Sequence, residues 1–341
     1  MLPLHGRCPF PIDVPQEPLL QSPCGFPLYG VLEFTTRIRY GVQQERALRV
    51  VGWGGTLAAE WTIREVLNWT RGYFKSAGIT QPRLEAEILL AHALDVDRLH
   101  LYLTPDKPLT PDERDRYRTV VKERQSGTPL QHLTGEVSFY GLRFRASKNA
   151  LIPRPETEEL LDHALRLAPR ERDIRCLDLG TGSGIIAVCL ARYLPRAHVT
   201  ALDISPAALQ LAATNAAMND VGERIEFMES DWFTHVTGRF DLIAANPPYV
   251  DREELAGLPQ EVRDHEPHEA LDGGVGGLEQ IEQLLRGVPK HLAPGGRLLM
   301  EIGASQGAQV VRMMTEVGLS DASALADLAG KDRFAVAREA S

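Results

Sequence analysis

The sequence predicts an α/β protein whose second half forms a doubly wound sheet of parallel strands. Three observations support this fold class: short apolar runs of strand length recur from residue 174 onward, segments with helical periodicity separate them, and a glycine cluster directly follows the first run. Parallel strands need crossover connections, which are usually helices, so the alternation favours a parallel sheet. A smaller helical segment and a hairpin precede it.

Composition is typical of a soluble globular protein. The 341 residues suggest two domains, and 43% hydrophobic with 24% charged residues provides an ample core. No apolar run approaches the roughly 20 residues of a membrane helix, and the N-terminus lacks a clean signal peptide. We therefore expect a cytoplasmic monomer without membrane contact. The net charge of −9 is concentrated in residues 146–341, which carry −11, and this argues against direct nucleic-acid binding.

Cysteine and histidine spacing predicts no metal site. None of the four cysteines forms a CxxC pair. Cys176 and Cys189 lie inside apolar stretches, which indicates reduced core residues. His265 and His268 have helical spacing but no evident third ligand.

The first residues, 1–58, differ from the rest of the chain. Prolines punctuate their beginning and glycines their end, and no helical or strand period persists. We expect a poorly ordered extension or a mis-assigned start, with a targeting or partner-binding arm as the alternative.

Residues 59–130 are expected to form a helical domain. Thr62 with Glu65, and Thr110 with Glu113, have the spacing of capping boxes, in which each side chain satisfies a free backbone N–H at a helix start. A further helix is expected to start at Pro82 and, being apolar on much of its circumference, to be buried.

Residues 131–150 are expected to form a hairpin linker that turns near Gly141, followed by the second domain at 151–341. Before the first helix of that domain, Arg154 lies between two prolines, and acidic residues follow. Acids in a first helical turn favour an ordinary helix start. The alternative is a loop that packs over a ligand.

The second domain contains five predicted strands, and helices or turns are expected between them. A turn is expected at 294–296, before the last strand. The predicted strands are 174–179, 198–203, 225–228, 240–245 and 297–302, and the predicted helices are 185–193, 206–219, 278–288 and 308–317.

A glycine-rich turn follows the first strand and predicts a nucleoside site. Its residues are Gly180, Thr181, Gly182, Ser183 and Gly184. The GxGxG spacing differs from the GxGxxG of dinucleotide-binding turns, and the lysine of a P-loop is absent. Asp203 ends the second strand, where it is placed to accept hydrogen bonds from both ribose hydroxyls. Together these features favour a nucleoside without a pyrophosphate, namely S-adenosylmethionine (SAM).

The fourth strand ends in Asn246, Pro247, Pro248 and Tyr249. The prolines cannot extend a central strand because they lack an N–H, so a stiff rim rich in acceptors is expected. Asn246 Oδ1 and the Pro247 carbonyl are suited to accept both hydrogens of a planar NH2 group, with Tyr249 as a wall. The alternative is an Asx-Pro turn with Tyr249 in the core.

The carboxyl ends of parallel strands share one crevice, which brings the glycine turn, Asp203 and Asn246 together. We assign Asn246 and Pro247 to positioning the acceptor nitrogen, because orientation supplies much of the catalysis in a methyl transfer from an activated donor. Asp178 is expected either to face the methionine ammonium or to cap the glycine turn. Trp232 is expected to lie against the adenine, with core packing as the alternative.

These motifs resemble the HemK/PrmC family of protein-(glutamine-N5) methyltransferases over residues 62–338. The resemblance rests on 152–158 (Ile-Pro-Arg-Pro-Glu-Thr-Glu), 178–184 (Asp-Leu-Gly-Thr-Gly-Ser-Gly), 230–233 (Ser-Asp-Trp-Phe) and 246–249 (Asn-Pro-Pro-Tyr). It implies a small helical domain joined by a hairpin to a class I, Rossmann-like SAM-dependent methyltransferase sheet of seven strands.

The resemblance also implies an activity and a partner. Members of the family methylate the glutamine of the Gly-Gly-Gln loop in class I peptide chain release factors. The implied cofactor residues are the glycine turn, Asp203, Trp232 and Asn246; Asn246 to Tyr249 hold the substrate amide; and the helical domain contacts the release factor. The alternatives are a glutamine of a ribosomal protein, a DNA adenine-N6 substrate, a SAM-binding protein without catalysis, and an NAD oxidoreductase.

Overall fold

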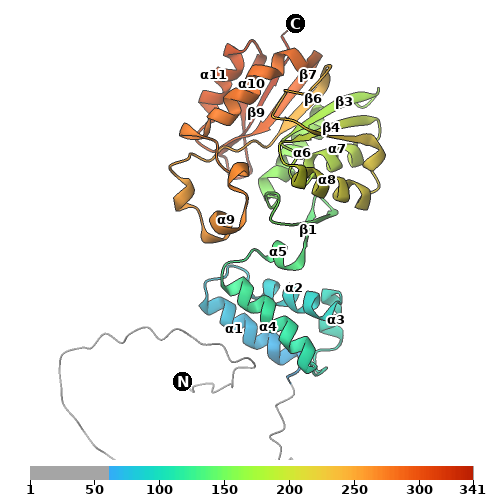
Figure 1. The fold of residues 1–341 in the computed structure, drawn as a ribbon, viewed down its shortest axis with the longest axis vertical. Coiled ribbons are helices and arrows are strands. Elements are labelled where there is room, and N and C mark those ends of the chain that lie inside the picture. Colours follow the sequence, from blue (N-terminus) through green and yellow to red (C-terminus); the bar gives the residue numbers. More distant parts are fainter. Residues whose placement is uncertain (1–60, 341) are drawn as a thin grey trace, which may run out of the picture.

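The computed structural model describes residues 61–340, in which a helical domain, a hairpin and a sheet domain follow one another (Figure 1). The prediction for residues 1–58, like Cys8 and Cys24, lies outside this part of the chain. Cys176 and Cys189 are buried free thiols, as predicted. No helix between residues 61 and 340 is both long enough and apolar enough to cross a membrane.

The helical domain contains three longer helices and two short ones. Both predicted capping boxes are present, at Thr62 with Glu65 and at Thr110 with Glu113. The two short helices, α3 and α5, were not predicted. The bounds are α1 Ile63–Ser76, α2 Pro82–Leu94, α3 Arg98–Leu103, α4 Pro111–Gln125 and α5 Leu130–Thr134.

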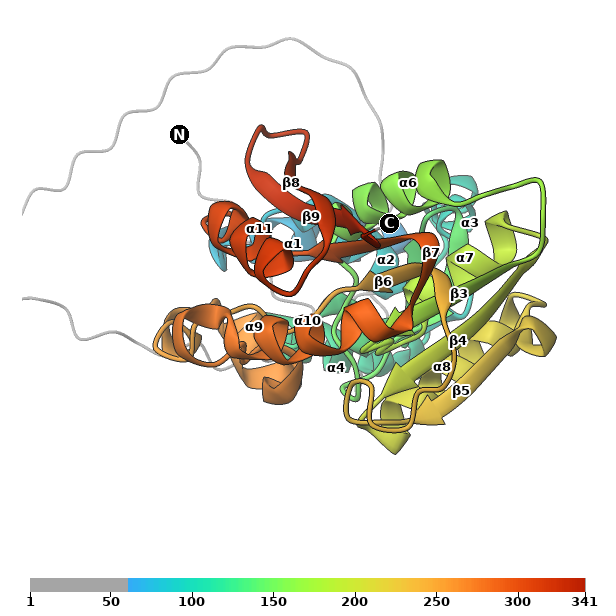
Figure 2. The same cartoon turned by 90° about the horizontal axis from the view of Figure 1, so that it is seen from above.

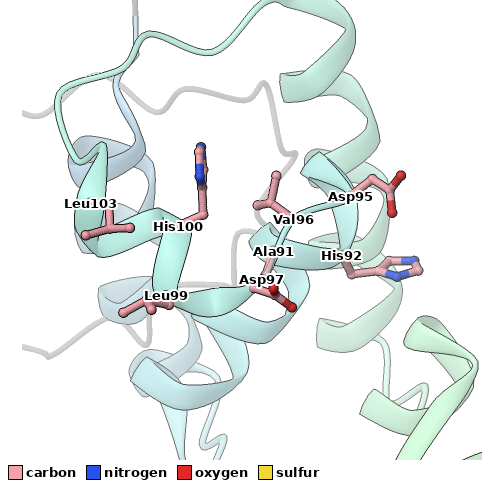
Figure 3. A pocket seen from close by; sticks show the side chains of 8 residues that line it. All are labelled: Ala91, His92, Asp95, Val96, Asp97, Leu99, His100 and Leu103. Atoms are coloured by element: carbon pink, nitrogen blue, oxygen red, sulfur yellow. The ribbon is translucent and has the colours of Figure 1, made fainter.

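The core of this domain lies where α1, α2 and α4 pack together. Phe74, Leu90 and Tyr117 are fully buried there. The predicted burial of α2 is confirmed, since seven of its 13 residues are buried. A hollow of about 580 Å³ lies between the end of α2 and α3 (Figure 3). Its lining residues all belong to the helical domain: Ala91, His92, Asp95, Val96, Asp97, Leu99, His100 and Leu103.

The hairpin consists of β1 (Glu136–Phe139) and β2 (Leu142–Arg145). Tyr140 and Gly141 have positive φ angles of 48° and 75°, as a tight two-residue hairpin turn requires, so the predicted turn is confirmed. Phe139 and Phe144 pack edge to face and belong to the core of the sheet domain. The hairpin is therefore anchored in that domain.

The sheet has seven strands in the order β5-β4-β3-β6-β7-β9-β8, with β5 and β8 at opposite edges (Figure 2). The five predicted strands are parallel, whereas β9 is antiparallel to both neighbours, so the sheet is mixed. The strands are β3 Ile174–Leu179, β4 Ala197–Asp203, β5 Ile225–Glu229, β6 Phe240–Ala245, β7 Leu292–Glu301, β8 Ser320–Ala326 and β9 Asp332–Arg338.

Two features of the sheet differ from the sequence prediction. Strands β8 and β9 were not identified from residue patterns, because β8 consists of serines, alanines and aspartate with one leucine, which have low strand propensity. Strand β7 begins at Leu292, before the expected turn. Its register shifts opposite Phe240, and the intervening residues, including Gly295 at φ 71°, bulge out of the ladder.

Helices cover both faces of the sheet. Alternate residues of β3 divide between two cores: Cys176 packs toward α6 and α7, and Leu177 toward α10 and α11. The helices are α6 Pro155–Leu167, α7 Ile185–Tyr193, α8 Pro206–Met218, α9 Gln260–His265, α10 Glu279–His291 and α11 Gly307–Glu316. Short 3-10 turns occupy Gly222–Arg224, Leu255–Gly257, His268–Ala270 and Val275–Gly277.

Helix α9 extends from the sheet domain toward the helical domain (Figure 1). Arg124 on α4 forms ion pairs with Glu85 on α2, at 2.5 Å, and with Glu261 on α9, at 3.1 Å. The side chains of Arg124 and Glu85 are only 9% and 12% exposed. Arg124 is thus held by its own domain while it bonds to the other.

Candidate active site

The ends of three neighbouring strands carry the candidate site. Leu179 on β3 pairs with Leu202 on β4 and with Ala245 on β6. The residues that follow, the glycine turn, Asp203 and Asn246, therefore lie along one edge of the sheet. Their predicted convergence is confirmed.

Two kinds of glycine occur in the turn between β3 and α7. Gly180, Gly182 and Gly184 all have positive φ angles. A Cβ on Gly184 would lie 2.9 Å from Ala212 Cα, so this glycine allows α7 and α8 to pack closely. A Cβ on Gly180 or Gly182 would meet nothing nearer than 3.9 Å. The backbone of the turn is thus open to a ligand.

Asp203 is held by backbone groups close to it. Its Oδ2 accepts from Gly182 N at 2.8 Å and its Oδ1 from Ser205 N at 2.9 Å. Burial raises the pKa of Asp203, and these N–H groups and that of Ile204 oppose the rise. A carboxylate has about four acceptor positions, so the protein does not use all of them and acceptor capacity remains for the predicted ribose hydroxyls. Ile204, 64% exposed, adds an apolar surface beside them.

Asp178 caps the glycine turn, which was one of its two expected roles. Its Oδ2 accepts from Thr181 Oγ1 at 2.6 Å and from Ala187 N at 3.0 Å. Its Oδ1 is buried without a hydrogen-bond partner. Complete burial raises the pKa of Asp178 to about 7. A buried acceptor without a donor at a ligand site indicates a place for a donor group of the ligand.

Trp232 lies beside the glycine turn. A Cβ on Gly180 would be 3.9 Å from Trp232 Cζ3, and Trp232 Nε1 donates to Gln280 Oε1 at 3.3 Å. Its φ of 44° is unusual for a bulky residue, and the Ser230 hydroxyl donates to its carbonyl at 2.8 Å. The partly exposed indole is therefore held in a defined orientation next to the expected cofactor turn.

The rim after β6 presents acceptors. Asn246 Nδ2 donates to Thr157 Oγ1 at 3.3 Å. Within residues 61–340, no group donates to Asn246 Oδ1 or to the Pro247 carbonyl. Both acceptors that the sequence assigned to an amide NH2 thus lack a donor from the protein.

Tyr249 is fixed at both ends of the residue. Its hydroxyl donates to Glu301 Oε1 at 3.0 Å, and its carbonyl accepts from Gln306 Nε2 at 2.9 Å. Gly273 and Gly277 contact its backbone so closely that neither position has space for a Cβ. These contacts to its backbone and hydroxyl hold the residue that follows the two prolines in place.

Arg154 has a partner that sequence patterns did not reveal. Helix α6 starts at Pro155 with acidic residues in its first turn, as predicted. Arg154 is its N-cap residue and pairs with Glu266 at 2.6 Å, although 112 residues separate them. Burial raises the pKa of Glu266, and the Arg154 guanidinium opposes that rise.

Sequence analysis missed three further side chains at the site: Thr157, Glu301 and Asn215. Buried Asn215 on α8 donates to the Ser183 carbonyl at 2.8 Å and accepts from Arg145 N at 2.6 Å, so it ties the hairpin to the glycine turn. Glu301 had a detectable signal, since it is a carboxylate at the end of an apolar strand, like Asp203. Thr157 lies in the stretch 152–158 that carries the family resemblance, but no role was assigned to it there, and Asn215 lies within a helix and had no signal.

Comparison with known proteins places this geometry in a family. The N-terminal part, residues 65–135, matches the model of the PrmC N-terminal domain, and residues 157–260 match that of the methyltransferase small domain. Among solved structures, the chain is similar to the ribosomal protein L11 methylase of Lactobacillus delbrueckii subsp. bulgaricus. That similarity has a TM-score of 0.43 and 21% identity, and covers 58% of this chain and 86% of the other.

Sequence relatives are much more similar. The release factor glutamine methyltransferase of Cereibacter sphaeroides is 46% identical over 263 residues, which cover 77% of this chain and 93% of the relative. The protein of the same name from Geobacter sulfurreducens is 43% identical over 274 residues, covering 80% and 95%. The chain belongs to the release factor glutamine methyltransferase family.

Proposed function

We propose that the protein transfers a methyl group from SAM to the side-chain amide nitrogen of the glutamine in the Gly-Gly-Gln loop of class I peptide chain release factors. The observation that carries this proposal is the pair of acceptors, Asn246 Oδ1 and the Pro247 carbonyl, that no protein group within residues 61–340 satisfies. A primary amide offers two N–H donors on one nitrogen, which matches this pair.

The residues at the glycine turn fit SAM. The buried Asp178 Oδ1 lacks a donor, and the methionine ammonium of SAM offers a charged one. Asp203 retains acceptor positions for the ribose, and the turn leaves room at Gly180 and Gly182. When bound, SAM supplies a methyl group on a positively charged sulfur, which is already activated for transfer.

The rim then acts by orientation. We assign Asn246 Oδ1 and the Pro247 carbonyl to the two amide hydrogens, which fixes the nitrogen and keeps its lone pair directed to the methyl group. Tyr249 forms the wall beside it. Orientation of this kind contributes on the order of 7–11 kcal/mol in favourable cases. The proton of the methylated nitrogen leaves to water after transfer, so no side chain is assigned as a base.

We assign the domains separate roles. Residues 59–130 recognise the substrate, 131–150 link the domains, and 151–341 carry out the transfer. The helical domain has an apolar surface on α3, where Leu99, Tyr102 and Leu103 are 67%, 50% and 69% exposed. Exposed apolar groups that cluster on one short helix favour a protein contact.

A transfer assay tests the function. The protein is incubated with labelled SAM and a full-length class I release factor, and mass spectrometry locates the added mass. A release factor whose Gly-Gly-Gln glutamine is replaced by asparagine is the matched control. We expect one methyl group on the glutamine and none on the control. Transfer to a ribosomal protein or to duplex DNA, with none to the release factor, would refute the proposed substrate.

A further inference from the structure

A buried hydrogen-bond chain lies behind Asn246. Asn246 Nδ2 donates to Thr157 Oγ1 at 3.3 Å, and Thr157 Oγ1 donates to Glu301 Oε2 at 2.8 Å. Tyr249 donates to the other oxygen, Glu301 Oε1, at 3.0 Å. Thr157 and Glu301 are 5% and 1% exposed, so solvent does not replace these partners.

The fold brings the members of this chain together from three elements. Thr157 lies in the first turn of α6, and Glu301 is the last residue of β7. Strands β6 and β7 pair at Ala245 and Met300, so Asn246 and Glu301 follow at the same level of the sheet. No short segment of sequence contains the arrangement.

We propose that Thr157 and Glu301 are positioning residues that determine which end of the Asn246 amide faces the substrate. Each oxygen of Glu301 accepts from a hydroxyl group, Oε2 from Thr157 and Oε1 from Tyr249. The Thr157 hydroxyl therefore gives its single hydrogen to Glu301 and offers only lone pairs to Asn246. Asn246 must then turn Nδ2 toward Thr157, which leaves Oδ1 for the substrate NH2.

The surroundings of Glu301 act on its pKa in both directions, and burial is the largest effect. Burial raises the pKa of Glu301, and Glu156 adds to the rise. The hydroxyl groups of Thr157 and Tyr249 and the charge of Arg333 oppose it, and all three favour the ionised form. Geometry carries the assignment: both Glu301 oxygens accept from hydroxyl groups, from Thr157 at 2.8 Å and from Tyr249 at 3.0 Å, and this sets the direction of the whole chain.

The inference rests on the proposed glutamine transfer and is tested with variants of Thr157. Thr157→Val keeps the shape but removes the hydroxyl, and Thr157→Ser restores it. Turnover is measured at saturating release factor and SAM, together with SAM affinity and melting temperature. Thr70→Val, at a fully buried threonine of α1, controls for loss of a buried hydroxyl elsewhere.

We expect kcat of Thr157→Val to fall about 100-fold, the scale of a misplaced reacting group, with SAM affinity within roughly threefold of wild type. Thr157→Ser should recover most of the turnover. A Thr157→Val protein that turns over like Thr70→Val would overturn the proposal, as would a Thr157→Ser protein as slow as Thr157→Val.

Glu301→Gln extends the test and replaces Thr157→Val if that variant does not fold. Glutamine keeps the size of the side chain but brings hydrogens of its own, so the direction of the chain is no longer fixed. We expect about a tenfold loss in kcat, which disappears in the Thr157→Val background because both changes break one chain. Unchanged turnover of Glu301→Gln contradicts the inference. Absence of transfer by the wild type contradicts the proposed function instead.

Discussion

Asp203 and Asn246 occupy equivalent places, at the ends of the two parallel strands that flank β3, but they are held in different ways. The protein partners of Asp203 are backbone N–H groups of Gly182 and Ser205, on its own loop and on the adjacent turn. Asn246 depends on the side chain of Thr157, 89 residues away, and through it on Glu301. The proposed cofactor side of the site is built from local backbone, whereas the proposed amide side is built from distant side chains.

This difference follows from the chemistry of the two side chains. The two oxygens of a carboxylate are equivalent acceptors, so backbone donors suffice to hold it in place. A primary amide has two unlike ends, and its orientation must be determined by partners of known polarity. A residue that binds an amide therefore requires partners that fix its orientation, and Asn246, to which we assign this role, has them in Thr157 and Glu301.

The largest effect is expected from removing the amide. Asn246→Ala should lower kcat by about 10³-fold, similar to the loss of a single preorganised polar group at a reacting centre. SAM affinity should stay within roughly tenfold, because the ribose and ammonium contacts are assigned to other residues. Calorimetry and single-turnover assays measure the two quantities. Loss of SAM binding with transfer intact would assign Asn246 to the cofactor in place of the substrate amide, and would contradict the proposed difference between Asn246 and Asp203.

A smaller effect, on the other ligand, is expected at Asp203. Asp203→Ala should weaken SAM binding about 10- to 100-fold, because it removes charge-assisted hydrogen bonds to the ribose and leaves the Gly182 and Ser205 N–H groups without partners. Turnover at saturating SAM should change much less. An affinity equal to wild type in titration calorimetry would remove Asp203 from the ribose site.

A substitution at Asn215 tests whether the glycine turn depends on residues that are distant in the sequence. Asn215→Ala removes the link between the hairpin and the glycine turn and leaves the buried Ser183 carbonyl and the partly buried Arg145 N–H without this partner. We expect the free energy of unfolding to fall by about 2 kcal/mol, with a modest loss of SAM affinity. Urea unfolding measures the first quantity. Unchanged SAM affinity at reduced stability would show that the turn keeps its shape without this distant support.

The last expected effect, at Asp178, depends on pH. The folded pKa of about 7 lies above the ordinary value of 3.8. The unfolded chain therefore releases its proton first as pH rises, and the free energy of unfolding falls between about pH 4 and about pH 7. The side chain of Asp178→Asn does not titrate, so the free energy of unfolding of this variant should fall less between about pH 4 and about pH 7. Parallel slopes for the two proteins in urea unfolding would show that Asp178 is ionised throughout.

Much of the fold was readable from the sequence because its signals are local. The capping boxes, the hairpin turn at Gly141 and the five parallel strands each depend on residues a few positions apart. Strand β8 was missed because its Ala and Ser residues form a strand only through pairing with β9. In the site, Asp203 and Asn246 were found from their places at strand ends, but their roles there remain predictions. Thr157 was not found, since a threonine in a helix has no visible partner until the fold is known.

One contact couples the two domains thermodynamically. Helix α9 lies on the segment that leaves Tyr249 and returns to Gly273, and Arg124 of the helical domain bonds to Glu261 on this helix. If a bound protein moves the helical domain, α9 must follow it or break the ion pair. By thermodynamic linkage, if binding of a protein to the helical domain strengthens binding of a ligand at the rim, then the ligand at the rim strengthens binding to the helical domain by the same free energy. A protein that places a glutamine at the rim and also contacts the helical domain would then bind cooperatively at the two places. An isolated glutamine peptide would lack this coupling free energy and would bind more weakly.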